Sequence, residues 1–365
     1  MLVLRLGLGI AEASFGPGIP LYLSWFFKRD ELARRTGLFI AAAPLANSFA
    51  GSLAWLILRF ANQSRIDGWR LLFIAEGFPN IILAVLAWHV IPDSPGSAVW
   101  LDRRERKIAT LRLQEGQSKS NADSKERETK KKLEWSKIAS TLIDPKSYIV
   151  ASILFSLNVA FSSLPVFLPT IVENMGFSAL SAQGMSAFPN LFAFVVVLVT
   201  ASLSDHFKSR SVPLIIHALM AMSGYALLAA APRMAHSLRY LCLFPMTAGF
   251  FSAVTMVIVW TVNIQESDEG KAVGSSILQV FGHLGSLVGQ QLYPDSGAPY
   301  YVKSHAICAF FMAMAALMAF VLRMVLRAAN RKQRRETARQ VFRKEEEDDA
   351  PFIGSSVADE FLYIL

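Results

Sequence analysis

Long apolar segments separated by shorter polar stretches dominate the chain from its first residue to about Arg327. Each apolar segment is close to the roughly 20 residues that a helix needs to cross the ~30 Å hydrocarbon core of a bilayer. We therefore predict an all-α integral membrane fold with nine spanning helices. The predicted spans are 2–27, 37–58, 69–91, 148–171, 181–203, 212–231, 240–262, 272–292 and 304–326.

Two polar stretches divide the spans into groups. The predicted divisions are 1–91 with three spans, 92–147 as a cytoplasmic central loop, 148–327 with six spans and 328–365 as a charged cytoplasmic tail. Within the central loop, 98–113 has a helical pattern, whereas 114–132 is rich in Lys, Glu and Ser. Such a composition does not bury a core, so we interpret the second part as a flexible linker.

The formal net charge is +8 over 365 residues, and Lys and Arg are concentrated in the central loop and from Arg323 onward. Because basic residues near spanning helices stay preferentially in the cytoplasm, this distribution places the loop and the tail there. Nine spans then place Met1 on the outer side. Binding of nucleic acid requires a basic face on a soluble domain. The basic residues follow membrane topology instead, so we predict no nucleic-acid partner.

Composition and motifs argue against an enzyme. Hydrophobic residues make up 53% of the chain and charged residues 18%. The two cysteines, Cys242 and Cys308, lie inside predicted spans, so neither a disulfide framework nor a metal cluster is indicated. The sequence contains no HExxH, GxSxG or GxxxxGK[ST] motif. We therefore predict no catalytic activity, no cofactor and no ATP-driven pumping.

Ionisable residues inside predicted spans are costly and indicate a transport pathway. Arg5 and Glu12 are seven residues apart and lie on one face of a helix. The cation is suited to attract an anionic substrate, and the carboxylate is suited to carry a coupling proton. The alternative for Arg5 is that its side chain extends to the outer interface. Glu76 and His283 are further candidates, and the alternative for His283 is a hydrogen bond to a neighbouring helix.

Polar residues within the spans are candidates for a cavity lining or for contacts between helices. They include Asn47, Asn158 and Gln279, and Trp260 is predicted to shape the cavity with them. The turn after the fifth span runs from Asp205 to Arg210 and places an acidic residue directly before basic ones. This turn is either a charge latch to a neighbouring helix or an ordinary basic cytoplasmic turn.

The chain resembles the anion:cation symporter branch of the major facilitator superfamily, in particular the fungal allantoate and nicotinate permease-like proteins. The stretches that carry the resemblance are Arg5 to Gly18, Gly68 to Gly77, Pro92 to Arg106, Asp205 to Arg210, Asp295 to Tyr301 and Phe361 to Leu365. The resemblance implies a fold of twelve helices in two six-helix halves, in which the first span here corresponds to the fourth helix. About nine of the twelve helices are then expected in this chain, which implies an N-terminal truncation.

The resemblance also implies roles for individual residues. Arg5 belongs to the family's arginine motif, which is linked with proton coupling, and Asp205, Lys208 and Arg210 form a cytoplasmic latch. His206 stands where the family usually has arginine. The family's antiporter-type Gly-Pro motif is absent around Pro44, which favours symport over exchange.

These observations lead to two hypotheses. The first is a monomeric, proton-coupled transporter in the plasma membrane that moves a small organic anion, such as a pyridine carboxylate, a ureide acid or a vitamin acid, by alternating access. Its partners are the substrate anion, the proton and the lipid bilayer. The second is a product that does not transport, being either a truncated form or an incomplete gene model.

Overall fold

The computed structural model describes residues 2–61, 67–115, 134–162, 172, 179–298, 300–347 and 362–365. Helices account for most of these residues, and the described part contains no strand. The helices are α1 (Leu2–Glu12), α2 (Phe15–Ser24), α3 (Leu32–Ala61), α4 (Gly68–Val90), η1 (Pro95–Ser97), α5 (Arg103–Glu115), α6 (Trp135–Ile143), α7 (Pro145–Phe161), α9 (Ala179–His206), α10 (Ser211–Ala230), α11 (His236–Ile264), α12 (Asp268–Gly289), η3 (Asp295–Gly297) and α13 (Val302–Glu347).

The described residues contain eight segments that are long and apolar enough to span a membrane, or nine if α6 and α7 count as one bent span. The axes of α6 and α7 meet at 58°. The structure therefore confirms the prediction of a multi-pass helical protein. Residues 163–171 of the fourth predicted span and 116–133 of the central loop lie outside the described residues.

The first predicted span consists of two helices, α1 and α2, which a turn at Ala13 and Ser14 separates. Pro17 explains the break, because proline has no backbone N–H to donate to the carbonyl of Ala13. Proline is tolerated in the first turn of a helix, where that donor is not used, and α2 therefore begins at Phe15.

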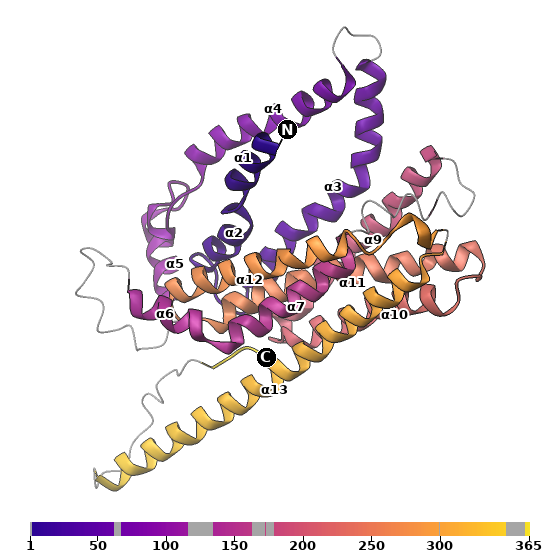
Figure 1. Cartoon of the computed structure of the whole chain (residues 1–365). Helices are drawn as coiled ribbons and strands as arrows, with labels where there is room; N and C mark the ends of the chain where they lie inside the picture. Colours follow the sequence, from indigo (N-terminus) through magenta and orange to yellow (C-terminus); the bar gives the residue numbers. More distant parts are fainter. Residues whose placement is uncertain are drawn as a thin grey trace.

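Helix α11 lies at the centre of the bundle and contacts α2, α3, α7, α9, α10 and α12 (Figure 1). Helix α12 packs closely on α7 through three glycines on one face, Gly282, Gly285 and Gly289. A Cβ atom at Gly285 would clash with the backbone carbonyl of Phe155. Small residues of this kind let two membrane helices approach at backbone distance.

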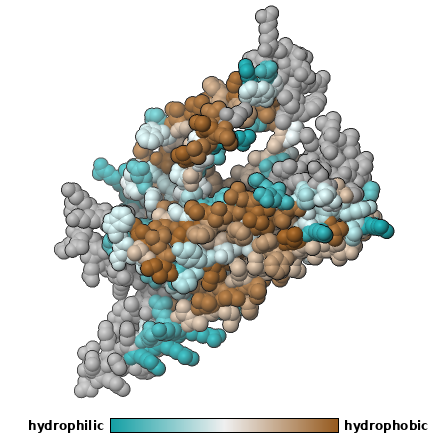
Figure 2. All heavy atoms as spheres, viewed as in Figure 1, coloured by the Kyte–Doolittle hydropathy of each residue, from teal (hydrophilic) through white to brown (hydrophobic). Residues whose placement is uncertain are grey.

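Helices α1 and α4 are packed differently from the bundle. Neither helix has a buried residue, and in Figure 1 both lie apart from the other helices. The main described contact of α4 is with α3. Figure 2 shows apolar residues in brown spread over the visible surface, as expected for a protein whose surroundings are hydrocarbon.

Helix α13 runs for 46 residues without a break, so the span predicted at 304–326 continues as a helix across Arg327 to Glu347. The first part of the predicted charged tail, from 328 to Glu347, is therefore helical. Ala, Arg, Lys, Gln and Glu dominate the extension, and these residues have high helix propensity. Residues 348–361 of the predicted tail lie outside the described residues.

Candidate functional site

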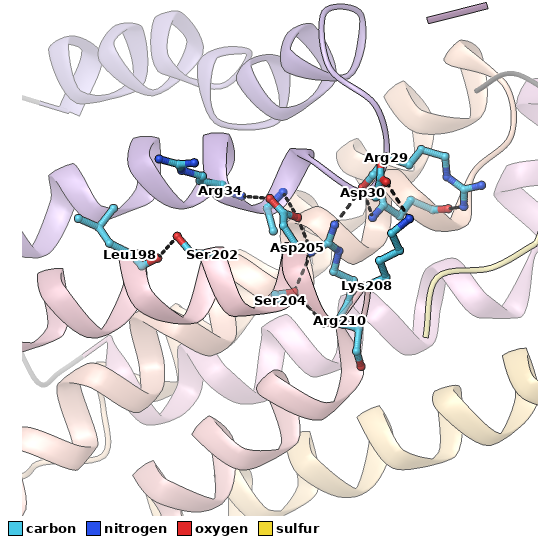
Figure 3. Close-up of polar contacts among 12 residues, drawn as sticks. Arg29, Asp30, Arg34, Leu198, Ser202, Ser204, Asp205, Lys208 and Arg210 are labelled. Atoms are coloured by element: carbon cyan, nitrogen blue, oxygen red, sulfur yellow. Dashed lines mark hydrogen bonds and ion pairs between the residues drawn. The ribbon is translucent and has the colours of Figure 1, made fainter. Parts of the chain in front are cut away.

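A cluster of charged residues forms where the turn between α2 and α3 meets the turn between α9 and α10 (Figure 3). We call Arg29, Asp30, Asp205, Lys208 and Arg210 the charge cluster. The end of the bundle that holds it is called the cluster end. Three cations and two anions in this set come from two segments that are far apart in the sequence.

Asp205 caps helix α3 from outside that helix. Its Oδ1 accepts the backbone N–H of Ala33 at 3.2 Å and its Oδ2 accepts that of Arg34 at 2.7 Å (Figure 3). Both donors lie in the first turn of α3, where backbone N–H groups have no partner within the helix. The carboxylate also lies at the positive end of the helix dipole. Asp205 thus joins the end of α9 to the start of α3.

Arg210 is fully buried and holds the cluster together. Its Nη1 lies 2.7 Å from Oδ1 of Asp205 and donates to Oγ of Ser204 at 2.7 Å, while Nη2 donates to the carbonyl of Arg29 at 2.9 Å. Burial lowers the pKa of the guanidinium, and the Asp205 carboxylate opposes that shift. The pairing with Asp205 therefore keeps a buried charge compensated.

The second ion pair of the cluster is more exposed. Nζ of Lys208 lies 3.2 Å from Oδ2 of Asp30. Lys208 has a φ of 49°, a left-handed conformation typical of the residue that follows the end of a helix, here α9. Burial alone would raise the pKa of Asp30, but the hydrogen bond from Lys208 and its charge hold it below its usual value.

Arg29 connects this cluster to the central helix α11. Its Nη2 donates to the carbonyl of Asn263, and Nδ2 of Asn263 donates to the carbonyl of Arg29 at 3.2 Å. Burial lowers the pKa of Arg29 to about 10, so the side chain stays cationic at neutral pH. Close packing supports these contacts, because a Cβ atom at Gly37 of α3 would clash with Ala201 of α9.

Of the three predicted latch residues, Asp205 and Arg210 pair with each other and Lys208 pairs with Asp30, so the cluster includes two residues that the sequence analysis did not single out. Arg29 and Asp30 lie in a run of four charged residues, Lys28 to Glu31, between two apolar segments. A run of charges between two apolar segments was the sequence feature that could have pointed to Arg29 and Asp30. The sequence does not show that this run meets the turn after α9. The two turns lie about 170 residues apart in the chain, as do Arg34 and Asp205, which are hydrogen-bonded.

The predicted pathway residues fall into separate groups. Arg5 and Glu12 are exposed on α1, and Asn47 is exposed on α3. Within the described part of the chain, no hydrogen bond or ion pair joins Arg5 or Glu12 to another predicted site residue. These three residues are therefore not assembled into one polar site in this structure.

A second group lies near the contact between α7 and α12. Nδ2 of Asn158 donates to the carbonyl of Gly282 at 2.9 Å, which holds the two helices together. The side chain of Gln279 lies against Gly16 of α2. His283 is exposed, and its Nδ1 lies 2.8 Å from the carbonyl of Gln279 in the same helix. The described hydrogen bond of His283 therefore lies within its own helix and does not reach a neighbouring helix.

Trp260 lies at the cluster end and is fully buried. Its Nε1 donates to the carbonyl of Ile364 at 3.0 Å. Its described polar partner is therefore a residue near the end of the sequence.

Two other features bear on ligand binding. No group of three His, Cys, Asp or Glu side chains suited to a metal ion occurs among the residues that the structure describes. An apolar groove between α9 and α11 is lined by Met185, Phe188, Leu191, Phe192, Val195, Tyr240 and Phe244. The hydroxyl of Tyr240 already donates to the carbonyl of Met185 at 2.8 Å, so the groove lacks groups that recognise an anion.

Residues 1–290 match the Major Facilitator Superfamily. The chain is 31% identical over 339 residues to the MFS transporter prlL of Fungal sp. (strain NRRL 50135), covering 92% of this chain and 66% of that protein. It is 27% identical to a putative tartrate transporter of Agrobacterium vitis, with 80% of this chain and 62% of that protein covered.

Among solved structures, the fold is similar to that of the proton:xylose symporter XylE bound to 6-bromo-6-deoxy-D-glucose. The TM-score is 0.61 at 18% identity, and the match covers 82% of this chain and 66% of that one. The chain spans less than two thirds of the length of these relatives. Relatives and fold are those of transporters and not of enzymes, as predicted from the sequence.

Proposed function

The chain belongs to the Major Facilitator Superfamily, and from this membership we propose that it is a secondary transporter that moves a small organic anion together with protons by alternating access. We place it in the anion:cation symporter branch, as a monomer in the plasma membrane. The observation that carries the proposal is the charge cluster, in which Asp205 and Arg210 connect two groups of helices.

The contacts of the cluster suit a gate that opens and closes. Asp205 holds the start of α3 through two hydrogen bonds, at 3.2 and 2.7 Å, beside close packing of Gly37 of α3 on Ala201 of α9. Opening requires these polar contacts to break and the packed start of α3 to separate from the end of α9, and water that enters the opening solvates the exposed groups. Alternating access requires such reversible closure on each side of the membrane.

An anionic substrate is supported by the relative named as a putative tartrate transporter, since tartrate is a dicarboxylate. In this proposal Arg5 attracts the anion and Glu12 or His283 carries the proton. Asn47, Asn158 and Gln279 contribute polar groups to the pathway. Trp260, which contacts Ile364, acts at the cluster end.

We propose that the cluster end faces the cytoplasm. Lys208 and Arg210 lie there, and Lys and Arg also dominate the extension of α13 beyond Arg327. Basic residues next to spanning helices are retained on the cytoplasmic side. An epitope placed after Ala338 tests the assignment, because antibody should stain it only in permeabilised cells.

Uptake of labelled substrate tests the proposed function. Cells that express the chain, with surface delivery verified by biotinylation, are given nicotinate, allantoate or tartrate at acidic external pH. The matched control is nicotinamide, which has the ring of nicotinate without its charge. We expect uptake of at least one acid, stimulated by acidic external pH and abolished by a protonophore, with no uptake of nicotinamide.

The alternative is that the chain does not transport by itself. It is favoured by the unpartnered apolar faces of α1 and α4, neither of which has a buried residue. Verified surface delivery with no uptake of any of the three acids would support this alternative and contradict the proposed function. Uptake that appears only on co-expression with a longer relative would indicate that the chain works as part of an assembly.

A further inference from the structure

The last described residues, Leu362–Leu365, lie at the cluster end without regular secondary structure and are held by side chains from several helices. Each of the four backbone carbonyls accepts a hydrogen bond. The donors are Arg29 Nη1 to Leu362 at 3.3 Å, Asn330 Nδ2 to Tyr363 at 2.9 Å, Trp260 Nε1 to Ile364 at 3.0 Å and the backbone N–H of Arg210 to Leu365 at 2.6 Å.

Side-chain contacts fix the register of this segment. The amide of Asn330 both donates to the carbonyl of Tyr363 and accepts its N–H, each at 2.9 Å. The ammonium of Lys146 donates to the hydroxyl of Tyr363 at 2.9 Å and lies 4.7 Å from the centre of its ring. The side chains of Tyr363 and Leu365 also pack against the hydrophobic core. Shifting the segment by one residue would break the paired bonds to Asn330.

The residues that hold the segment come from five places in the fold. Arg29 precedes α3, Lys146 belongs to α7, Arg210 precedes α10, Trp260 belongs to α11 and Asn330 belongs to α13. Arg29 and Arg210 are also members of the charge cluster. Trp260 is fully buried, so its indole N–H would be left without this partner if the segment departed. A short segment outside the helices is ordered when contacts with the rest of the fold hold it in place.

We propose that these residues form a peptide-binding site whose occupant is the chain's own segment Leu362–Leu365, and that the bound segment holds the cluster end closed. The segment bonds to Arg29 on the side of α3 and to Arg210 on the side of α9 and α10, so it bridges the same helices that Asp205 joins. Opening this end requires the segment to release at least one of them. This consequence rests on the proposed function, whereas the binding site does not.

Digestion by a carboxypeptidase of the chain expressed with Leu365 as its last residue tests the site without any transport substrate. The enzyme removes Leu365 only when the segment is free, so the rate of leucine release measures unbinding. The test variants are Asn330→Ala and Trp260→Phe, which remove donors to the segment. The matched control is Gln333→Ala, one turn along α13, whose side chain has no described bond to the segment. We expect release at least tenfold faster than in the control.

A binding measurement in trans guards against variants that merely unfold. A chain that lacks residues 362–365 is titrated with the labelled peptide Leu-Tyr-Ile-Leu, and Leu-Ala-Ile-Ala serves as the control peptide. We expect saturable binding of the first peptide that Asn330→Ala weakens at least tenfold. Equal binding of the two peptides, or equal leucine release from Asn330→Ala and Gln333→Ala, would overturn the site.

Closure is measured by maleimide labelling of Thr36→Cys, since Thr36 is fully buried near the start of α3. The native Cys242 and Cys308 are both buried and give the background, which is measured without the substitution. Removing residues 362–365 should raise the labelling rate at least fivefold, and adding Leu-Tyr-Ile-Leu should restore it. An unchanged rate would overturn the closing role. Neither readout uses uptake, so failure of transport alone leaves the proposed segment site standing.

Discussion

Helices α4 and α11 are equally apolar and yet are packed in opposite ways. Their most apolar 18-residue stretches have the same mean hydropathy, but 0% of that stretch is buried in α4 and 83% in α11. The exposed side of α4 carries bulky residues such as Trp69, Phe73 and Phe78. Helix α11 presents Gly249 and Ser252 within its buried face. Equal hydropathy therefore does not set how a membrane helix packs, because α11 is surrounded by six other helices whereas α4 mainly contacts α3.

The largest expected difference between the packed bundle around α11 and the exposed α4 concerns their ion pairs. Asp205→Asn leaves the buried Arg210 without its counter-charge, and we expect a loss of about 3 kcal/mol because an uncompensated buried charge is costly. Asp67→Asn removes the exposed pair with Arg70 at the start of α4, where the ions lie 3.3 Å apart. There we expect a loss of about 0.5 kcal/mol or less.

Thermal unfolding in nanodiscs, followed by the fluorescence of a thiol-reactive dye at the buried cysteines, measures both changes. Equal destabilisation by the two substitutions would contradict the cluster's role as the link between α3 and α9.

A pair of glycine substitutions tests the difference in packing between the bundle and α4. Gly285→Ala, in α12 of the bundle, places a Cβ atom against the backbone carbonyl of Phe155, and overpacking of this kind costs about 1–3 kcal/mol. Gly77→Ala in α4 meets nothing within 4 Å. Because alanine favours helix over glycine, the second substitution should be neutral or stabilising by up to about 1 kcal/mol. The same unfolding assay compares them, and a destabilising Gly77→Ala would mean that α4 has a packing partner at this position.

The smallest expected effect is the pH dependence of the pair between Asp30 and Lys208. The pKa of Asp30 is lowered in the folded chain, so its contribution is fully present above the ordinary value of 3.8 and is lost as the pH falls through the lower folded value. The pair is partly exposed, so we expect less than about 1 kcal/mol. Unfolding of the native chain and of Asp30→Asn should differ at pH 6 and converge at acidic pH. A difference that persists below the folded pKa would contradict this assignment.

The sequence predicted most of the membrane-spanning helices. Continuous apolar runs located the spans, and α13 extends past its predicted span because an apolar run marks the length that suits hydrocarbon and not the end of a helix. Hydropathy changes at Arg327, but Ala, Lys, Arg and Glu continue the helix to Glu347. The break between α1 and α2 was readable in principle from Pro17, which removes a backbone donor.

The candidate site was predicted only in part. The resemblance to a family singled out Asp205, Lys208 and Arg210, and in the structure Arg210 pairs with Asp205 whereas Lys208 pairs with Asp30. The resemblance did not identify Arg29 and Asp30, whose partners are set by the packing of α3 on α9. The roles proposed for Arg5, Glu12, Asn47, Asn158, Gln279 and His283 remain predictions, because the described contacts do not assemble them into one site.

By itself the sequence determined that the chain is a helical membrane protein, because about 20 apolar residues at a time have no other stable environment. Only the tertiary structure decided that Asp205 caps α3, that Arg210 is buried beneath Arg29 and that Leu362–Leu365 is bound beside Trp260. The physical reason is the number of chain segments on which each property depends. Partition into hydrocarbon depends on the composition of one segment, whereas a polar contact depends on two segments that meet only after the helices have packed.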